Sequence, residues 1–357
     1  MNVFLWNARA RNSQVEATLN HPFAAQAVTD AKQQKTLLAE RDCIAKFDHR
    51  FVVDFYGAFQ DRDFVYLAIE YASGGDLYSF MYEHEAECAK FKGKLGGLND
   101  KTARFYLACI ILGLEHMHSH NVAWRDLKPE NTLFDDVGYV KLSDFGFAKE
   151  FVHSDHEDGT TDDARTFTLC GTPDYLAPEI VLSQGHDKAV DFWALGVLAY
   201  ELLYATTPFA HESQGELFQN ILSASALVHE DAMWPGDCSP EARSFISELL
   251  HTQPSFRLGN LNGGYDAIKR HGFFAKVEEH DFAWPPLAAG DADVLPPPYA
   301  PPKPLNPLAP ANFTPDADVE GYADTTYTGA QEVFDRWSEL HNEHGTLFDA
   351  DDLHMAK

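Results

Sequence analysis

The chain has no glycine before Gly57, although it is 357 residues long and contains 23 glycines. A glycine-rich loop that wraps phosphate groups with its backbone N–H groups therefore has no place upstream of that residue. Cysteine is also scarce, since the five cysteines are widely spaced and no C-x-x-C pair occurs. This pattern argues against a disulfide framework and a thiolate zinc site, and it indicates a reducing, cytoplasmic compartment.

Basic residues are also few relative to acidic ones, and long apolar runs are absent. The chain has 27 Lys and Arg against 55 Asp and Glu, for a formal net charge of −28. That balance argues against nucleic acid as a partner and favours either basic peptides or a merely solvated acidic surface. The longest apolar run, Val190–Ala205, contains Asp191 and Glu201 and is too short to span a membrane, so it predicts a buried helix. The N-terminal apolar run is too short for a signal peptide.

The first half of the chain predicts a mixture of helix and strand. Residues 1–30 show no clear periodic pattern. Apolar residues recur at helical spacing over 31–46, and two β-rich runs at 50–59 and 64–71 predict a hairpin. Ser73-Gly74-Gly75 then breaks the chain, as a linker between two lobes does.

Beyond residue 75 the pattern is mostly helical. Asn99 is suited to cap a helix that runs to about His120, and Ser239-Pro240-Glu241 opens another one. Residues 295–310 are rich in proline and predict an extended segment. With 45% hydrophobic residues, the chain is able to fill one large core or two lobes.

Two motifs in the middle of the chain carry the chemistry. They are Arg125-Asp126-Leu127-Lys128-Pro129-Glu130-Asn131 and Asp144-Phe145-Gly146. Phosphoryl transfer needs a carboxylate that orients the attacking hydroxyl, oxygen ligands for magnesium, and positive charge near the transferred group. Asp126 suits the first role and Lys128 the last, while Asn131 and Asp144 supply the hard oxygen ligands that Mg²⁺ prefers. Either motif alone is weak evidence, but the two in this order and spacing are specific.

The chain resembles the eukaryotic protein kinases at these motifs and at others in the expected order. The amino-acid sequences of the motifs are similar to those of the AGC group, specifically the cyclic-nucleotide-dependent serine/threonine kinases. The resemblance covers residues 31–315 and implies ATP and Mg²⁺ as cofactors. The further motifs are Thr168-Leu169-Cys170-Gly171-Thr172-Pro173-Asp174-Tyr175, Ala177-Pro178-Glu179, Asp191-Phe192-Trp193, Arg257-Leu258-Gly259-Asn260-Leu261 and, in the tail, Asn312-Phe313.

The resemblance implies a nucleotide site between two lobes. Glu70 falls in the hinge, where backbone groups meet the adenine, and Ile69 is the residue that gates the pocket. Leu133 is expected to pack beneath the adenine ring. Asp76 matches an acid near the ribose and the substrate peptide.

It also implies a basic peptide substrate. Asp76, Glu130 and Glu201 match the acids that hold arginines upstream of the target residue, and Thr172 marks a serine/threonine-specific site. The strongly negative charge agrees with a basic substrate. The alternative interpretation is that these three acids are surface residues that do not contact the substrate.

Thr168 matches the site at which the activation segment of this family is phosphorylated. Arg125 and Lys149 are expected to pair with a phosphate there, which implies an upstream kinase or a regulatory subunit as partner. An acidic insertion at 153–163 precedes this site. We interpret this insertion as a solvated loop. The alternative is that its carboxylates mimic a phosphate and pair with the same cations.

The expected fold is α+β, a kinase-like pair of lobes with a truncated small lobe. Residues 1–30 lie outside the match, 31–72 form the partial small lobe, 73–274 the mainly helical large lobe, and 275–357 a tail that is proline-rich and then acidic. Four residues have structural roles by resemblance: Arg257 pairs with Glu179, Asp191 opens the buried helix, and Glu40 is the helix glutamate that pairs with a lysine of the third strand.

That lysine is absent. The best candidate for the third strand is Phe23–Val28, in which Gln26 takes the place of the lysine. If the chain is aligned to the family without a gap, His21 stands at the lysine position instead. Contacts of this kind contribute about 2.7–4 kcal/mol each. Because the rest of the catalytic set survives, the loss of a contiguous block favours an incomplete reading frame or a splice variant. The alternative function is a catalytically impaired, pseudokinase-like regulator or scaffold.

Two smaller features complete the expectations. Trp124 stands where the family has His or Tyr before Arg-Asp, and an aromatic ring still fits the packing role. The histidines His116, His118 and His120 suggest a metal site only superficially and are read as structural.

Overall fold

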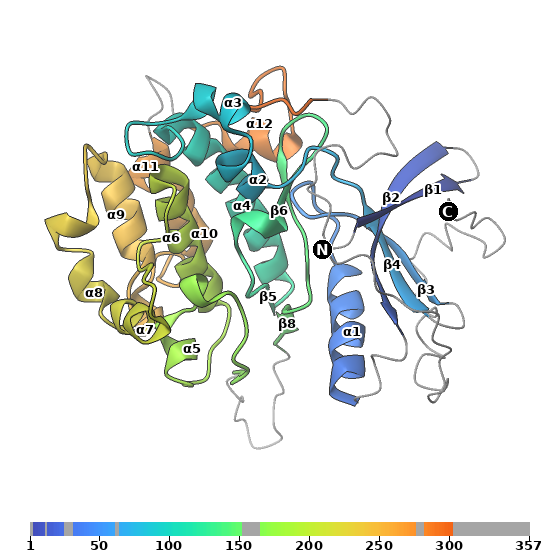
Figure 1. Cartoon of the computed structure of the whole chain (residues 1–357), viewed down its shortest axis with the longest axis horizontal. Helices are drawn as coiled ribbons and strands as arrows, with labels where there is room; N and C mark the ends of the chain where they lie inside the picture. Colours follow the sequence, from blue (N-terminus) through green and yellow to red (C-terminus); the bar gives the residue numbers. More distant parts are fainter. Residues whose placement is uncertain are drawn as a thin grey trace.

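The computed structural model describes residues 3–10, 13–24, 31–60, 64–151, 165–275 and 282–302. Figure 1 shows two lobes: a sheet with one helix beside it, and a larger, mainly helical part. The α+β architecture that the sequence predicts is confirmed. The acidic insertion at 153–163, Gln26 and the tail from residue 303 lie outside the described residues.

The small-lobe sheet has four antiparallel strands in the order β1-β2-β4-β3. They are β1 (Val3–Ala10), β2 (Ser13–Ala24), β3 (Phe55–Gln60) and β4 (Phe64–Glu70). The hairpin of β3 and β4 was predicted. Strand β2 covers Phe23 and Ala24 of the strand proposed at Phe23–Val28 and begins at Ser13, ten residues earlier than proposed, while residues 25–28 lie outside the described residues. Two strands therefore occupy the segment in which no periodic pattern was recognised.

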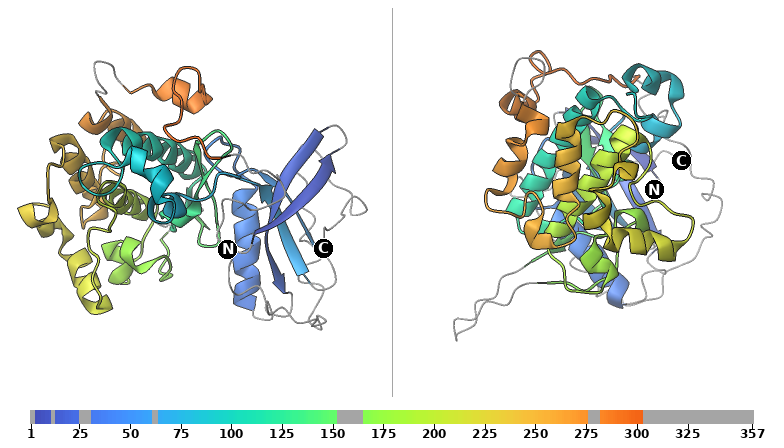
Figure 2. Two further views of the ribbon diagram at one scale, coloured as in Figure 1. Left: turned by 45° about the horizontal axis from the view of Figure 1, so that its top comes forward. Right: turned by 90° about the vertical axis from the view of Figure 1, so that its left-hand side faces the viewer.

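Helix α1 (Ala31–Ile44) matches the helix predicted over 31–46. It lies along the sheet on the side that faces the large lobe, as Figures 1 and 2 both show. Cys43 and Ile44 are buried at its end and join the core that the large lobe continues. The helix therefore connects the sheet to the site described below.

Three predicted helices form the centre of the large lobe. Helix α4 (Asp100–Ser119) is capped by Asn99, whose side chain accepts from the backbone N–H of Thr102 at 3.0 Å. Helix α6 (Ala189–Tyr204) is buried at all 16 positions, as its apolar run predicts. Helix α9 (Pro240–Leu249) is capped by Ser239. Apolar periodicity and cap residues were thus reliable guides here.

Shorter elements surround these helices. They are α2 (Leu77–Tyr82), α3 (Glu85–Cys88), η1 (Ala89–Phe91), β5 (Val122–Ala123), η2 (Pro129–Asn131), β6 (Thr132–Phe134), β7 (Val140–Leu142), β8 (Lys149–Glu150), η3 (Pro173–Tyr175), α5 (Pro178–Val181), α7 (Gln214–Leu222), α8 (Ala224–Leu227), η4 (Asp231–Met233), η5 (Pro254–Phe256), α10 (Gly264–Lys269), α11 (Gly272–Ala275) and α12 (Trp284–Ala289). Strand β5 pairs with β8, and β6 with β7, both antiparallel. The loop with the Arg125–Asn131 motif connects β5 to β6. Within the described residues, no helix has the length and apolar character needed to cross a membrane.

The linker between the lobes requires its glycines. The Gly74 N–H donates to the Phe134 carbonyl at 2.9 Å, and a Cβ at this position would lie 2.5 Å from the Cβ of Phe134. Gly75 has φ +84°, which disfavours other residues. The hinge is therefore held close to strand β6, next to the catalytic loop.

Candidate active site

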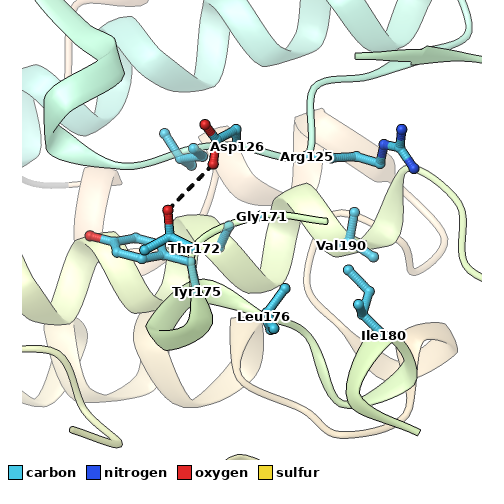
Figure 3. Close-up of a pocket in the computed structure, with 10 residues that line it drawn as sticks. Arg125, Asp126, Gly171, Thr172, Tyr175, Leu176, Ile180 and Val190 are labelled. Atoms are coloured by element: carbon cyan, nitrogen blue, oxygen red, sulfur yellow. Dashed lines mark hydrogen bonds between the residues drawn. The ribbon is translucent and has the colours of Figure 1, made fainter. Parts of the chain in front are cut away.

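Asp126 lies at the centre of a hydrogen-bonded set in the catalytic loop. The residue is 4% exposed, and its Oδ2 accepts from Asn131 Nδ2 at 2.7 Å and from Lys128 Nζ at 3.0 Å. Thr172 joins the set, because its hydroxyl accepts from Lys128 at 3.2 Å and lies 3.5 Å from Asp126 Oδ1. Figure 3 shows Thr172 facing Asp126, with the Arg125 side chain directed away from the pair. The four residues that the sequence linked to phosphoryl transfer and serine/threonine specificity are thus brought together.

Asp144 is held by its own turn and by Trp124. Its backbone has φ +64°, its Oδ1 accepts from the Gly146 N–H at 3.1 Å, and its carbonyl accepts from the indole Nε1 of Trp124 at 2.8 Å. Trp124 is fully buried. The tryptophan therefore does more than fill space, since it ties the catalytic loop to the second motif.

Asp191 fixes the backbone of the catalytic loop. Its carboxylate is fully buried and accepts from the N–H groups of Trp124 at 2.8 Å and Arg125 at 2.7 Å. His118 Nε2 lies 2.8 Å from the same carboxylate, and the Tyr265 hydroxyl lies 2.8 Å from His118 Nδ1. His118 is thus structural, as expected. No cluster of three or more metal-ligating side chains was found in the part of the chain that is described.

The donors proposed for Mg²⁺ fit a hard cation. The amide nitrogen of Asn131 donates to Asp126, which leaves the amide oxygen for a ligand. Asp144 uses one carboxylate oxygen for the Gly146 N–H, and no described residue donates to the other. Oxygen donors of this type suit magnesium.

The hinge residues lie at the lobe boundary. Ile69 and Leu133 are buried, and Leu133 forms a backbone bridge with Asp76. The Asp76 carboxylate caps α2 by accepting from the Ser79 N–H at 2.8 Å and from its hydroxyl at 2.9 Å. The Glu70 side chain accepts from Lys141 at 2.7 Å, an ion pair that joins the two lobes.

Glu201 is a buried acid whose carboxylate is held by two tyrosines. Its carboxylate is 7% exposed and accepts from the Tyr82 hydroxyl at 2.8 Å and from the Tyr175 hydroxyl. Burial raises the pKa of Glu201 to about 7, and the nearby charge of Glu130 contributes. Burial likewise raises the pKa of Glu130, which has Asp76 as a neighbour. The three acids that the resemblance links to arginine binding thus influence one another electrostatically.

The activation segment presents Thr168 at the surface. Thr168 is exposed, and its hydroxyl lies 3.3 Å from that of Thr166. Arg125 donates from Nε to the Phe147 carbonyl at 2.7 Å. Lys149 is an exposed residue of β8. No contact between Lys149 and Thr168 is present among the described residues.

The pair of Arg257 and Glu179 is present and buried. Two parallel hydrogen bonds of 2.6 Å join the guanidinium to the carboxylate, and Arg257 is fully buried. Arg257 also donates to the Ala189 carbonyl at the start of α6. The pair therefore links three distant segments of the large lobe.

The small-lobe side of the site differs from the large-lobe side in how its buried acid, Glu40, is compensated. Removal from solvent, together with the negative charge of Asp144, raises the pKa of Glu40 to about 8. Strand β2, which pairs with β4 and has the sequence SQVEATLNHPFA, contains no lysine or arginine. No cation pairs with Glu40 among the described side chains.

Comparison with known proteins gives the family. The family model described as "Protein kinase domain" matches residues 14–274. The chain belongs to the protein kinase family. The match begins near the start of β2, so it includes part of the segment that was expected to lie outside the resemblance.

The relatives are cyclic-nucleotide-dependent kinases. The chain is 39% identical over 250 residues to the cAMP-dependent protein kinase catalytic subunit of Dictyostelium discoideum, covering 70% of this chain and 34% of that protein. It is 39% identical to the cGMP-dependent protein kinase of Toxoplasma gondii, covering 75% and 24% respectively. The human cAMP-dependent protein kinase catalytic subunit PRKX is 35% identical, covering 74% of this chain and 67% of that protein. The chain thus spans about a third of the length of the first relative.

Sequence reasoning missed the contacts of three side chains of the site, of which Trp124 was expected only to fill space and Tyr175 was recognised only as part of a motif. Tyr82 and Tyr175 hold Glu201, and Trp124 donates to the Asp144 carbonyl. Tyr175 ends a recognised motif, which was an available signal. Tyr82 lies 119 residues from Glu201 in the chain, so no local pattern indicates their contact.

Proposed function

We propose that the chain transfers the γ-phosphoryl group of ATP, with Mg²⁺, to serine or threonine in arginine-containing peptides. The observation that carries this proposal is the set of hydrogen bonds that Asp126 makes with Lys128, Asn131 and Thr172. Such transfers need positioning and charge more than covalent catalysis. ATP and Mg²⁺ would supply the phosphoryl group and neutralise its charge, and Asn131 and Asp144 would hold the metal.

Asp126 orients the attacking hydroxyl and accepts its proton. A P–O bond then forms to the γ-phosphorus, while the bond to the oxygen of the β-phosphate breaks. Lys128 contributes positive charge beside Asp126, and its bond to Thr172 fixes its position. The hinge near Glu70, with Ile69 and Leu133, would enclose the adenine, and Asp76 would approach the ribose.

The acids around Glu201 support a basic substrate. When Glu201 is ionised, its buried carboxylate favours a guanidinium, which forms parallel hydrogen bonds with carboxylates. Glu201→Gln should therefore lower kcat/KM for an arginine peptide about 10- to 100-fold relative to its alanine analogue. The ratio of the two peptides in a steady-state assay measures this, with Glu216→Gln on the exposed face of α7 as control. An unchanged ratio would exclude Glu201 from arginine recognition.

Thr168 is proposed as a regulatory phosphorylation site, modified by an upstream kinase. Its exposure makes it accessible, and Arg125 and Lys149 are the candidate partners of the phosphate. A regulatory subunit that covers this surface is a further proposed partner.

A second function, a non-catalytic kinase-like regulator, is favoured by one observation: β2 contains no lysine or arginine, and no cation pairs with Glu40 among the described side chains. Two measurements separate the functions. We expect a thermal shift with ATP and Mg²⁺, and transfer of labelled phosphate to an arginine-rich peptide that is lost in Asp126→Ala. Absence of both the shift and the transfer would refute catalysis by this chain and favour the regulator.

A further inference from the structure

His186 lies against the arginine of the catalytic loop and takes no part in the set around Asp126. The imidazole is 4% exposed, and its Nε2 lies 3.3 Å from Arg125 Nη1. Arginine is only a donor, so Nε2 is the acceptor and the proton of the neutral ring is on Nδ1. Burial and the charge of Arg125 both lower the pKa of His186, which agrees with a neutral ring.

The same histidine is joined to the activation segment. His186 and Thr166 form a two-way backbone bridge, with N···O distances of 2.9 and 3.0 Å. The Thr166 hydroxyl lies 3.3 Å from that of Thr168. Arg125 is therefore connected to the exposed threonine through His186 and the backbone of Thr166.

Arg125 is constrained at its other contacts as well. Its backbone has φ +67° and donates to Asp191, and its Nε donates to the Phe147 carbonyl. In Figure 3 its guanidinium points away from the pair of Asp126 and Thr172. His186 is thus the side chain that holds one guanidinium nitrogen, Nη1, on the side of the activation segment.

We propose that His186 is a positioning residue that aims the Arg125 guanidinium at a phosphate on Thr168. The inference rests on the proposed phosphorylation of Thr168. A fixed guanidinium loses less side-chain freedom when it pairs with a phosphate. The carboxylates of Glu179, Asp187 and Asp191 also act on His186 and oppose the lowering of its pKa by Arg125, so the site is not uniformly positive.

The test is ³¹P NMR of the full chain carrying genetically encoded phosphothreonine at position 168, which needs no catalytic activity. The second pKa of a free phosphothreonine is about 6, and a nearby cation lowers it. We expect a lowered value in the folded chain, a rise of about half a unit or more in His186→Phe, and recovery in His186→Gln, whose side-chain oxygen accepts from Arg125. His229→Phe, at an exposed position, is the control.

The outcomes distinguish two failures. If the phosphate of the unsubstituted chain titrates as it does in urea, Thr168 is not a phosphate site and the inference falls with it. If the pKa is lowered but His186→Phe leaves it unchanged, the phosphate site stands and the role of His186 is refuted. A loss of melting temperature in His186→Phe without a change in this pKa would likewise show a merely structural residue.

Discussion

The two lobes differ in how their charged groups are compensated. In the large lobe, Asp126, Asp191 and Glu179 each accept two or more short hydrogen bonds from named donors. On the small-lobe side, Glu40 faces Asp144 and no cation pairs with it among the described side chains. The difference shows that the large lobe organises its half of the site without help from the sheet. Strand β2, which contains no lysine or arginine, provides no candidate for the missing cation.

The largest effect is expected at the centre of the large-lobe set. Asp126→Asn keeps the shape but removes the proton acceptor, so kcat for peptide phosphorylation should fall about 10²- to 10⁴-fold. Steady-state kinetics measure the loss, and melting temperature reports the fold. Asp136→Asn, at an exposed position in the same lobe, is the control. Full activity in Asp126→Asn would contradict the proposed role.

The buried ion pair should dominate the stability of the large lobe. Arg257→Met leaves the Glu179 carboxylate buried without its partner, which should cost about 3–5 kcal/mol of the free energy of unfolding. Arg243→Met removes the solvent-exposed ion pair with Asp231 and should cost less than about 1 kcal/mol. Urea denaturation measures both. Equal costs would show that the pair of Arg257 and Glu179 is not what links the segments.

The lobe boundary should be sensitive to acid. Burial lowers the pKa of His49 to about 4, and the stacked ring of His116, 4.8 Å away, contributes. A histidine takes up protons at higher pH when unfolded, with an ordinary pKa of 6.5, so folding stability is complete above that pH and is lost as pH falls towards 4. At pH 5 the loss is at most about 2 kcal/mol.

His49→Gln should remove this part of the pH dependence, while His211→Gln, at an exposed position, should not. Urea denaturation at pH 7 and pH 5 measures the difference. If His49→Gln loses as much stability on acidification as the unsubstituted chain, the imidazoles at the boundary are not the cause.

The large lobe was predictable because its signals are local. The apolar run of α6, the cap of α4 by Asn99 and the catalytic motifs each lie within a few residues. Strand β2 was missed, although Val15, Ala17 and Leu19 alternate with polar residues. Its identity depends on pairing with β4, which is about fifty residues away in the chain.

The same contrast between local signals and long-range contacts applies to the candidate site. The residues within one motif, Asp126, Lys128 and Asn131, were placed together from their spacing. The contacts of Glu201 with Tyr82 and of Arg125 with His186 join segments that are 119 and 61 residues apart. Only the folded arrangement of the lobe brings these side chains together.

The most direct test of the central claim restores a cation to β2. Asn20 pairs with Leu67 of β4, which places position 20 on the same face of the sheet as Ile69, part of the core shared with Ile44 of α1. If the large lobe is complete and the missing charge limits the activity, Asn20→Lys should raise kcat/KM for an arginine peptide at least about tenfold. Leu19→Lys, on the opposite face, should not raise it.

The measurement is the steady-state kcat/KM of these two variants, each with and without Asp126→Asn. The account predicts a gain in Asn20→Lys alone that disappears when Asp126 is also replaced. No gain, or an equal gain in Leu19→Lys, would contradict the claim that the two lobes differ by a missing cation in β2.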